Sequence, residues 1–413
     1  MDEKKINIIT IVMSVVAVIS VVAVLIVNFL LKDTVRGGKD KEDEYEACLI
    51  QARTEYEQGE YLLSISSYLS AIDNIEPEEQ DYVMLVDSLI QVKDYPMALN
   101  YAYILLDRTE DTEVLEKIYF TVADIYVGEK NYRAAYNMLS EAEERVSGIL
   151  DKYCEEKTDV SICLAPYADD TESEYDYVFL GSYPQTGLSG KEVPEYVTKA
   201  EFDSDNYAQI YGREYIRAGE EGNYTYYLYE PVRWWVLKDD EEQLTLLADK
   251  ILDCRQYNKS MAAITWDSSD LRTWMNDEFY NTCFNKAEQE YVLDHVTASP
   301  YNYCHLYYAG EDCTDKISLM PAFDLANGTY YFKTHNDEAD KLLRIAVGTE
   351  YARSQGLLVD ENGGGRWWTC TSATLDNMAV VVITENGNVL MESGGEYVNK
   401  SDVGVRPLIT ITK

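Results

Sequence analysis

The stretch that most constrains the fold of this chain is residues 6–31, INIITIVMSVVAVISVVAVLIVNFLL, which contains no charged residue. A helix of this length would span roughly 39 Å, enough to cross a lipid bilayer with some tilt. A cleaved secretory signal has a shorter apolar core and a small-residue cleavage site, which the following KDTVRGG does not supply. The sequence therefore predicts a single uncleaved transmembrane anchor over 6–31, preceded by a short flank, 1–5.

The charges beside this segment bear on its orientation. Lys4 and Lys5 precede it, and four basic residues follow it closely: Lys32, Arg36, Lys39 and Lys41. Counted strictly, the positive-inside rule favours a cytoplasmic C-terminus. A very short N-terminal flank, however, is typical of a signal anchor that exports its C-terminus, and all eight cysteines lie beyond the anchor. We predict a single-pass cell-membrane protein with its C-terminal domains outside the cell.

The net charge of the chain limits its partners. The 413 residues include 74 acidic and 35 basic residues, for a formal charge of −39. Such a chain repels the phosphate backbone of nucleic acids, so nucleic acid is excluded as the expected partner. The length is sufficient for two or three domains with their own cores.

A charged linker over 32–44 leads into residues 45–150, where the pattern is helical and repeats. The fragments GEYLLSISSYLSAI, KDYPMALNYAYILL and KNYRAAYNMLSEAE align on Tyr61, Tyr95 and Tyr132, at intervals of 34 and 37 residues. Thirty-four residues is the tetratricopeptide period, and the pattern resembles that family. The resemblance implies an all-α array that binds protein or peptide partners, or that serves as a spacer or dimerisation element.

After an acidic linker over 151–175, residues 176–413 change to strands and turns with helices between them, which predicts an α+β domain. The glycines 363–365 lack the lysine and helix of a phosphate loop and are followed by strand-like residues. Asn386-Gly387 between two apolar runs predicts a hairpin. The predicted fold class is therefore multidomain: a single transmembrane helix, an all-α tetratricopeptide-like array, then an α+β domain.

Two further local structures are predicted in this domain. The segment PVRWWVLKDDEEQLTLLADKIL predicts a hairpin around Asp239–Glu242. The segment DSSDLRTWMNDEFYNTCF is amphipathic, which predicts a helix whose N-cap is Asp267, Ser268 or Ser269.

A set of segments carries a family resemblance. They occur in this order: LGSYPQ (180–185), EPVRWWVL (230–237), DKILDCRQYN (249–258), LRTWMNDEFYNTCF (271–284), EYARSQGL (350–357), RWWTCTS (366–372), DN (376–377) and GVRP (404–407). Together they resemble the bacterial domain-of-unknown-function family 6273, found largely in anaerobic Firmicutes, which implies no established activity. The closing segments are also similar to C-type-lectin-like folds, a group that includes formylglycine-generating enzymes. This second resemblance implies a C-type-lectin-like α+β domain.

The lectin-like resemblance suggests a recognition surface at one end of the closing sheet. The candidate ligand-binding residues are Trp367, Trp368, Asp376, Asn377, Asn386 and Asn388. Indoles can stack on sugar faces or apolar side chains, while amides and carboxylates hold hydroxyl groups. In the alternative interpretation the paired tryptophans build the core, and Arg406 of GVRP anchors the last strand through a buried carboxylate.

Recognisable catalytic and metal-binding patterns are scarce in the sequence. His295, His305 and His335 lack the spacing of a helical zinc site, and no G-x-S-x-G motif occurs. Formylglycine-generating enzymes use a cysteine pair near the C-terminus, for which Cys370 has no nearby companion. Residues 203–214 lack the glycine of a calcium-binding EF-hand loop. We expect no catalytic residue, no metal ligand and no cofactor, with calcium left as an option on composition alone.

The cysteines permit local disulfides. Cys154 with Cys163, and Cys304 with Cys313, each lie nine residues apart. Buried thiols are the alternative interpretation for several of the cysteines.

These observations predict a membrane-anchored bacterial surface binding protein rather than an enzyme. Its helical-repeat stalk would present a lectin-like recognition domain to a glycan, peptide or protein ligand. One alternative is an oxidative enzyme of the formylglycine-generating type. The other is a scaffold on the inner face of the membrane that binds partners through its repeats.

Overall fold

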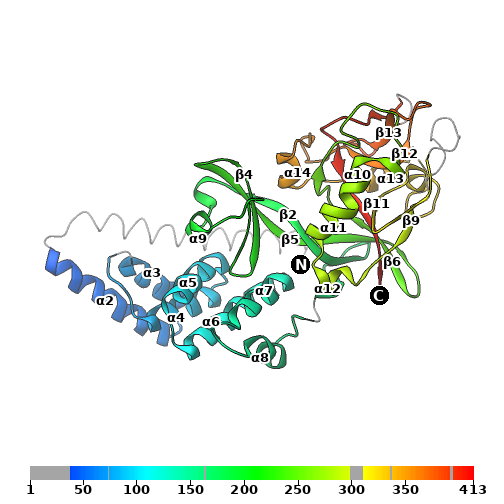
Figure 1. The fold of residues 1–413 in the computed structure, drawn as a ribbon. Coiled ribbons are helices and arrows are strands. Elements are labelled where there is room, and N and C mark those ends of the chain that lie inside the picture. The colour runs from blue at the N-terminus through cyan, green and yellow to red at the C-terminus, as the bar shows by residue number, and fades with distance from the viewer. Residues whose placement is uncertain (1–37, 73, 162–163, 298–309, 335–336, 391–393) are drawn as a thin grey trace, which may run out of the picture. The chain divides into compact units, whose positions relative to one another are not determined.

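The structure is a computed structural model that describes residues 38–72, 74–161, 164–297, 310–334, 337–390 and 394–413 (Figure 1). The chain divides into two compact units. The first comprises Met1–Ile125 and Ala142–Ile149, and the second comprises Tyr126–Glu141 and Leu150–Lys413. Each is described by itself.

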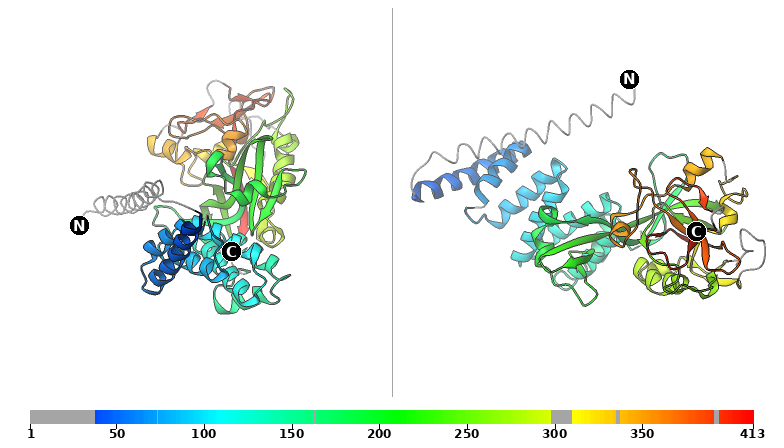
Figure 2. Two further views of the ribbon diagram at one scale, coloured as in Figure 1. Left: turned by 90° about the vertical axis from the view of Figure 1, so that its left-hand side faces the viewer. Right: turned by 90° about the horizontal axis from the view of Figure 1, so that it is seen from above.

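The first unit is built from helices that are consecutive in the chain (Figure 2). They are α2 (Gly38–Glu57), α3 (Tyr61–Ile72), α4 (Glu79–Gln91), α5 (Tyr95–Arg108) and most of α6 (Thr112–Gly128). Each of α2 to α4 packs on the next helix along the chain. Alanines lie fully buried at these contacts, among them Ala52, Ala71, Ala98 and Ala102. Since an alanine carries only a methyl group, the helix axes can approach closely.

The second unit begins with α7 (Tyr132–Ala142) and α8 (Ile149–Glu156), and continues into a large sheet. Within the described residues this sheet has nine strands in antiparallel pairs. The main order is β1 (Tyr167–Ala168), β2 (Tyr177–Leu188), β5 (Asn223–Asp239), β6 (Gln243–Ala248), β17 (Pro407–Thr412) and β11 (Ile317–Leu319). The other three strands are β3 (Tyr207–Ile210), β4 (Arg213–Glu220) and β8 (Val292–Leu293).

A second sheet lies in the same unit and has six strands in the described part of the chain. Its order is β14 (Val389–Leu390), β13 (Ala379–Ile383), β12 (Trp367–Ser372), β16 (Gly404–Val405) and β7 (Asp253–Cys254), with β15 (Glu396–Tyr397) beside β13. The pair of β12 with β16 is parallel. A separate two-stranded sheet joins β9 (His295–Thr297) to β10 (Cys313–Asp315).

Short helices connect these strands. They are α9 (Glu195–Lys199), α10 (Asp270–Trp274), α11 (Tyr280–Cys283), α12 (Lys286–Gln289), α13 (Glu338–Arg344) and α14 (Glu350–Ser354), and a π-helical turn over Met275–Phe279 joins α10 to α11. Single 3-10 turns occur at Gly190–Glu192, Trp266–Ser268 and Ala322–Leu325. The side chain of Ser269 accepts a hydrogen bond from the Arg272 backbone N–H and caps α10, as the sequence predicts for one of three candidate residues.

The described part of the second unit contains two large hydrophobic clusters and a smaller one around Val197, Tyr215 and Tyr226, and the tryptophan pairs are divided between the two large ones. Trp234 and Trp368 belong to one cluster, whereas Trp235 and Trp367 belong to the other. Successive side chains on a strand point to opposite faces of the sheet, so a Trp-Trp pair necessarily contributes one indole to each side. Each Trp-Trp pair therefore lies on a strand that separates two hydrophobic clusters and contributes one indole to each of them.

The predicted fold class is wrong in its first element. Among the described residues, no helix is both long and apolar enough to cross a membrane. The longest of these helices, α2, is rich in charged residues along its length. The predicted anchor, residues 6–31, lies outside the described residues. What the structure contains instead is helices together with large, mainly antiparallel sheets, and the predicted membrane location stays a prediction.

Candidate functional site

The two tryptophans predicted to form a recognition surface lie in the protein interior. Trp367 and Trp368 are both 0% exposed. The Nε1 of Trp367 donates to the Arg344 carbonyl at 3.0 Å, and the Nε1 of Trp368 donates to the Arg255 carbonyl at 2.8 Å. Because both faces and the single polar atom of each indole are already occupied, neither ring can stack on a ligand. Both tryptophans are part of the core, which is the alternative interpretation of the sequence.

The polar residues predicted to accompany them are not gathered in one place. Asp376 and Asn377 precede β13, whereas Asn386 and Asn388 follow it in the turn to β14. The five residues of β13 separate the two groups by roughly 16 Å at the usual rise of a strand. Asp376 is occupied locally, since it accepts from the Thr374 hydroxyl at 2.7 Å, a contact that lowers its pKa. The predicted surface is therefore not assembled in the structure.

The cysteines predicted to pair are only partly within the described residues. Cys154 and Cys313 carry free thiols, while Cys163 and Cys304 lie outside the described part of the chain. The two disulfides stay predictions. Cys370, the residue on which an oxidative enzyme would depend, is buried, and burial raises the pKa of its thiol far above the usual value. A thiol in such surroundings is a poor source of thiolate.

The calcium option gains no geometric support from the one loop considered for it. The Asp203 carboxylate accepts from the backbone N–H groups of Asp205 and Tyr207, both at 2.9 Å, and so closes a turn. Within the residues that the structure describes, no group of three or more His, Cys, Asp or Glu side chains is arranged to hold a metal ion.

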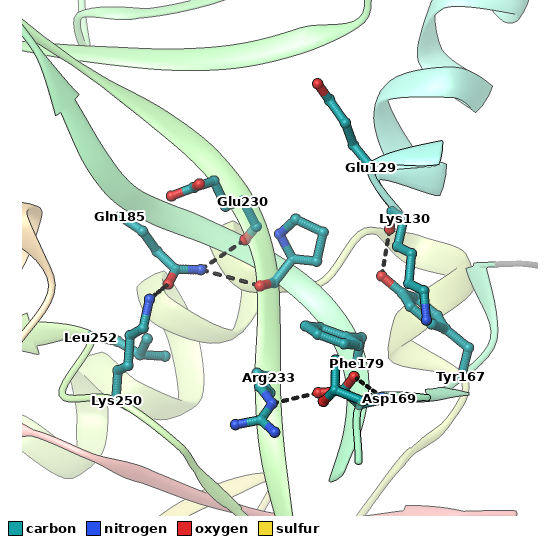
Figure 3. A pocket seen from close by; sticks show the side chains of 12 residues that line it. Glu129, Lys130, Tyr167, Asp169, Phe179, Gln185, Glu230, Arg233, Lys250 and Leu252 are labelled. Atoms are coloured by element: carbon teal, nitrogen blue, oxygen red, sulfur yellow. Dashed lines mark hydrogen bonds and ion pairs between the residues drawn. The ribbon is translucent and has the colours of Figure 1, made fainter. Parts of the chain in front are cut away.

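A different part of the second unit forms a cavity of about 360 Å³, shown in Figure 3. Its lining comes from β1, β2 and β5, from the turn after β6, and from the residues that precede α7. This volume falls at the lower end of the range for sites that bind small molecules. The cavity is the candidate functional site.

One wall of the cavity is aromatic. Tyr167 and Phe179 are cross-strand partners of β1 and β2, and their rings stack with centroids 5.3 Å apart. Tyr132 meets the Tyr167 ring edge to face at 4.8 Å. The Tyr167 hydroxyl donates to the Lys130 carbonyl at 2.6 Å, as Figure 3 shows, which holds this wall in position. Apolar atoms from Leu252 complete the lining.

Arg233 supplies a fixed cation beside this wall. It is the cross-strand partner of Phe179, and its Nε donates to Asp169 Oδ2 at 2.6 Å. Its Nη1 donates to Asp249 Oδ2 at 3.0 Å, and its guanidinium lies 3.5 Å from the centre of the Tyr177 ring. Burial works to raise the pKa of Asp169, but hydrogen bonds from Thr171 and Arg233 outweigh it and lower that pKa. The carboxylate is therefore kept ionised and holds Arg233 in one orientation.

Gln185 and Lys250 lie on the other side of the cavity. The Gln185 Nε2 donates to the backbone carbonyls of Glu230 and Pro231, at 3.2 and 3.1 Å. This arrangement turns the Gln185 Oε1 toward the Lys250 ammonium, which donates to it at 3.4 Å. Lys250 is exposed, and in the described chain no carboxylate lies within ion-pairing distance of its ammonium.

The charges of the lining are balanced, in contrast with the chain as a whole. Three basic residues (Lys130, Arg233 and Lys250) and three acidic residues (Glu129, Asp169 and Glu230) line the described cavity, in a chain of formal charge −39. Lys130 pairs with Asp170 at 2.7 Å, and Arg233 pairs with Asp169 and Asp249. Lys250 is thus the basic group of the cavity that is open to a negatively charged ligand.

A second buried polar group lies in the same unit. The Tyr183 hydroxyl donates to Asp253 Oδ2 at 2.6 Å, and Arg255 Nε lies 3.6 Å from the same oxygen. Burial raises the pKa of Asp253, although Arg255 and Tyr183 partly offset that effect. Because Tyr183 and Asp253 are both buried, this group is a structural support of the sheet rather than a ligand site.

The C-terminal part of the second unit is similar to one known family. Residues 241–413 match the family model described as Domain of unknown function (DUF6273). The DUF6273 match begins just before β6 and includes Lys250 and Leu252 of the cavity, whereas Gln185 and Arg233 precede it. No curated protein and no solved structure matches the chain. The comparisons therefore support the resemblance to a domain of unknown function and give no support to the tetratricopeptide and lectin-like resemblances.

The sequence contains a signal for this cavity in the polar residues of three motif segments. Gln185 closes LGSYPQ, Arg233 lies in EPVRWWVL, and Lys250 lies in DKILDCRQYN. Each of these three segments contributes a polar side chain to the same cavity (Figure 3). Polar residues beside apolar ones in motif segments are a better indication of a site than the apolar residues themselves, since large apolar side chains are usually core.

Proposed function

We propose that this protein is a binding protein, and that the cavity beside Arg233 and Lys250 recognises a ligand bearing a carboxylate, such as the C-terminal end of a peptide. The observation that carries the proposal is the meeting of three motif segments at one aromatic-walled cavity. There they place the Gln185 amide and the Lys250 ammonium beside the fixed Arg233 guanidinium.

The chemistry of the lining favours a singly charged ligand. Lys250 offers one positive charge without a carboxylate partner in the described chain, so one carboxylate balances it. A phosphate group would bring a second negative charge into a protein that already carries a large negative charge. Phe179, Tyr167 and Leu252 offer apolar contact to the last side chain of a peptide.

Backbone groups of a bound peptide would find partners as well. The Glu230 carboxylate already accepts from the Thr186 N–H at 3.0 Å and from its hydroxyl at 2.8 Å, through one oxygen. Its other oxygen is available to a peptide N–H of the ligand, since a carboxylate can accept about four hydrogen bonds. The Glu230 carboxylate can bind a peptide N–H while Lys250 binds the terminal carboxylate. The cavity would therefore prefer the C-terminal end of a peptide to an isolated anion.

The proposal is tested by isothermal titration of the full-length chain with acetylated dipeptides that end in Ala, Leu or Phe. Each peptide is used in two forms, with a free C-terminal carboxylate and with a C-terminal amide. We expect the carboxylate form to bind at least tenfold more tightly, because a charge-assisted hydrogen bond contributes about 1.5 to 3 kcal/mol. Equal affinity for the two forms would show that the cavity does not recognise a carboxylate.

The helices over residues 45–150, of which α7 belongs to the second unit, enter this proposal as a partner-binding or spacer array of the tetratricopeptide kind. The aligned tyrosines support it, since Tyr61 begins α3, Tyr95 begins α5 and Tyr132 begins α7. The three tyrosines lie 34 and 37 residues apart, and each begins a helix, as equivalent positions of a repeat would. Limited proteolysis of the full-length chain tests this: an array of repeats yields protected fragments that end between helices, and a different set of boundaries contradicts it.

A further inference from the structure

A row of directly opposed residues crosses the large sheet from β1 to β17, and its first three members line the cavity. Tyr167 is the cross-strand partner of Phe179, and Phe179 is that of Arg233 (Figure 3). The fourth member is Asp249, which directly follows β6, and its backbone N–H donates to the Arg233 carbonyl at 3.0 Å. The fifth is Arg406, which directly precedes β17. Side chains in such a row lie on one face of the sheet, with neighbouring Cβ atoms about 5 Å apart.

The register of β6 with β17 places Arg406 opposite Asp249. Leu408 pairs with Leu247, and the same register continued by two residues pairs Arg406 with Asp249. Arg406 Nε donates to the Ala248 carbonyl at 2.8 Å, which holds the guanidinium beside this end of β6. Burial lowers the pKa of Arg406 to about 10, and Asp249 partly offsets that effect. Arg406 is therefore a cation at neutral pH, and Asp249 is the carboxylate that acts on it.

Asp249 is shared between two guanidinium groups of unequal exposure. Its Oδ2 accepts from Arg233 Nη1 at 3.0 Å on the side of the cavity, and its side chain is partly exposed. Arg406 stands on its other side and is only 2% exposed. The sequence predicts a buried carboxylate for Arg406, whereas the structure gives it a partly exposed one that also serves Arg233. Because Arg406 is buried, water screens its charge less than it screens a surface charge.

The charges beside the aromatic wall of the cavity balance only when Arg406 is counted. Arg233 pairs with Asp169 and with Asp249, and these three groups together carry one net negative charge. Arg406 supplies the positive charge that cancels it. Lys250 directly follows Asp249 in the chain and lines the cavity. With Arg406 in place, the group around Arg233 adds no net negative charge beside the Lys250 ammonium.

We propose that Arg406 is a specificity-determining residue of the cavity, although it does not line it: its buried charge offsets Asp249 and so preserves the preference for a carboxylate ligand. This inference rests on the proposed function of the cavity. Without Arg406, the group around Arg233 would present one negative charge near Lys250, which repels a carboxylate and leaves a neutral amide unaffected. If Arg406 only anchored β17 through the Ala248 carbonyl, its loss would affect both ligands alike.

The first test is isothermal titration of full-length Asp249→Asn with the acetylated dipeptide that ends in leucine, in its carboxylate and amide forms. The variant removes one negative charge from the row, so we expect the carboxylate form to bind severalfold more tightly than to the unaltered protein. Binding of the amide form should not change. If Asp249 served only to hold Arg233 in place, the same variant would weaken binding instead. Because Asp249 is partly exposed, its replacement leaves the core intact.

Variants of Arg406 separate its charge from its packing. Arg406→Lys keeps the charge and should keep the preference for the carboxylate form, whereas Arg406→Gln should reduce that preference severalfold. Adding Asp249→Asn to Arg406→Gln removes the opposite charge as well and should restore the preference. The matched control is Arg344→Gln, because Arg344 is also fully buried but donates to three backbone carbonyls and does not line the cavity. That variant should melt at lower temperature with an unchanged preference.

The outcomes distinguish this inference from the proposed function. Equal affinity of the unaltered protein for the two peptide forms would contradict both. A carboxylate preference that is present in the unaltered protein but is not strengthened in Asp249→Asn would overturn the role of Arg406 and leave the proposed function standing. The same holds for a preference that folded Arg406→Gln retains in full.

Discussion

Arg133 of α7 and Glu288 of α12 form a buried ion pair in the second unit, although 155 residues separate them in the chain. Arg133 Nε donates to Glu288 Oε1 at 3.3 Å, and Arg133 Nη2 donates to the Cys283 carbonyl at 2.7 Å. A second carboxylate, Glu214, lies 3.4 Å from Arg133 Nη1. One arginine therefore joins α7 to two separate parts of the sheet-containing unit.

Replacing this arginine should destabilise the protein strongly. Arg133→Met leaves the buried Glu288 carboxylate and the partly buried Glu214 carboxylate without their cation, for which the expected loss is about 3 to 5 kcal/mol in the free energy of unfolding. Denaturation in urea measures it. The double variant Arg133→Met with Glu288→Leu removes the charge on both sides and should recover part of the loss. A single variant as stable as the unaltered protein would mean that the pair contributes nothing to this packing.

The stability of the protein should fall in mild acid because of His295. Burial lowers the pKa of this histidine, and its Nε2 lies 2.8 Å from the Ser318 hydroxyl. Asp315 and Asp294 partly oppose the lowering, while Lys316 adds to it. Just below the unfolded pKa of about 6.5 the unfolded chain binds the proton more readily than the folded one. The neutral His295 therefore makes its full contribution to the free energy of unfolding above a pH of about 6.5. That contribution is lost as the pH falls from this value toward the lower pKa of His295 in the folded protein.

The measurement is the free energy of unfolding between pH 7.5 and pH 5 for the unaltered protein and for His295→Gln. Glutamine keeps a side-chain hydrogen-bonding group near Ser318 but does not titrate. We expect the variant to show a flatter pH dependence across this range. Identical slopes for the two proteins would exclude His295 as the source.

The turn between β13 and β14 should tolerate no side chain at Gly387. Gly387 has a φ of 72°, and a Cβ there would collide with the Lys341 carbonyl oxygen. Gly387→Ala therefore combines left-handed backbone strain with a clash and should cost about 2 to 5 kcal/mol. Gly328 is the matched control, because its φ is 79° but a Cβ there meets nothing within 4 Å. Gly328→Ala should cost only about 1 to 2 kcal/mol, and equal melting temperatures for the two variants would contradict the clash.

Local structure in this protein followed from local sequence. The turn at Asn386-Gly387 joins two paired strands, with Ile383 opposite Val389, and the Gly387 N–H donates to the Thr384 carbonyl. The hairpin around Asp239–Glu242 is present as β5 and β6. Both predictions are confirmed because each rests on residues that touch each other within a few positions of the chain.

Features that depend on distant segments could not be predicted in the same way. Alternation in RWWTCTS shows that Trp367 and Trp368 point to opposite faces, but it cannot show that both faces are covered. Both faces are covered because one hydrophobic cluster packs around Trp368 and another around Trp367. The cavity was missed for a related reason, since Gln185, Arg233 and Lys250 come together only through the pairing of β2, β5 and β6.

The most direct test of the proposed function compares two lysine variants in the titration with carboxylate and amide peptides. Lys250→Gln removes the cation of the cavity that has no carboxylate partner in the described chain. Lys238→Gln is the matched control, because Lys238 also lies near the β5–β6 hairpin but pairs with Asp240 at 2.8 Å and does not line the cavity. The account predicts that Lys250→Gln weakens binding of the carboxylate peptide about tenfold or more and leaves the amide peptide unchanged, while Lys238→Gln changes neither. Unchanged carboxylate binding in Lys250→Gln would contradict it.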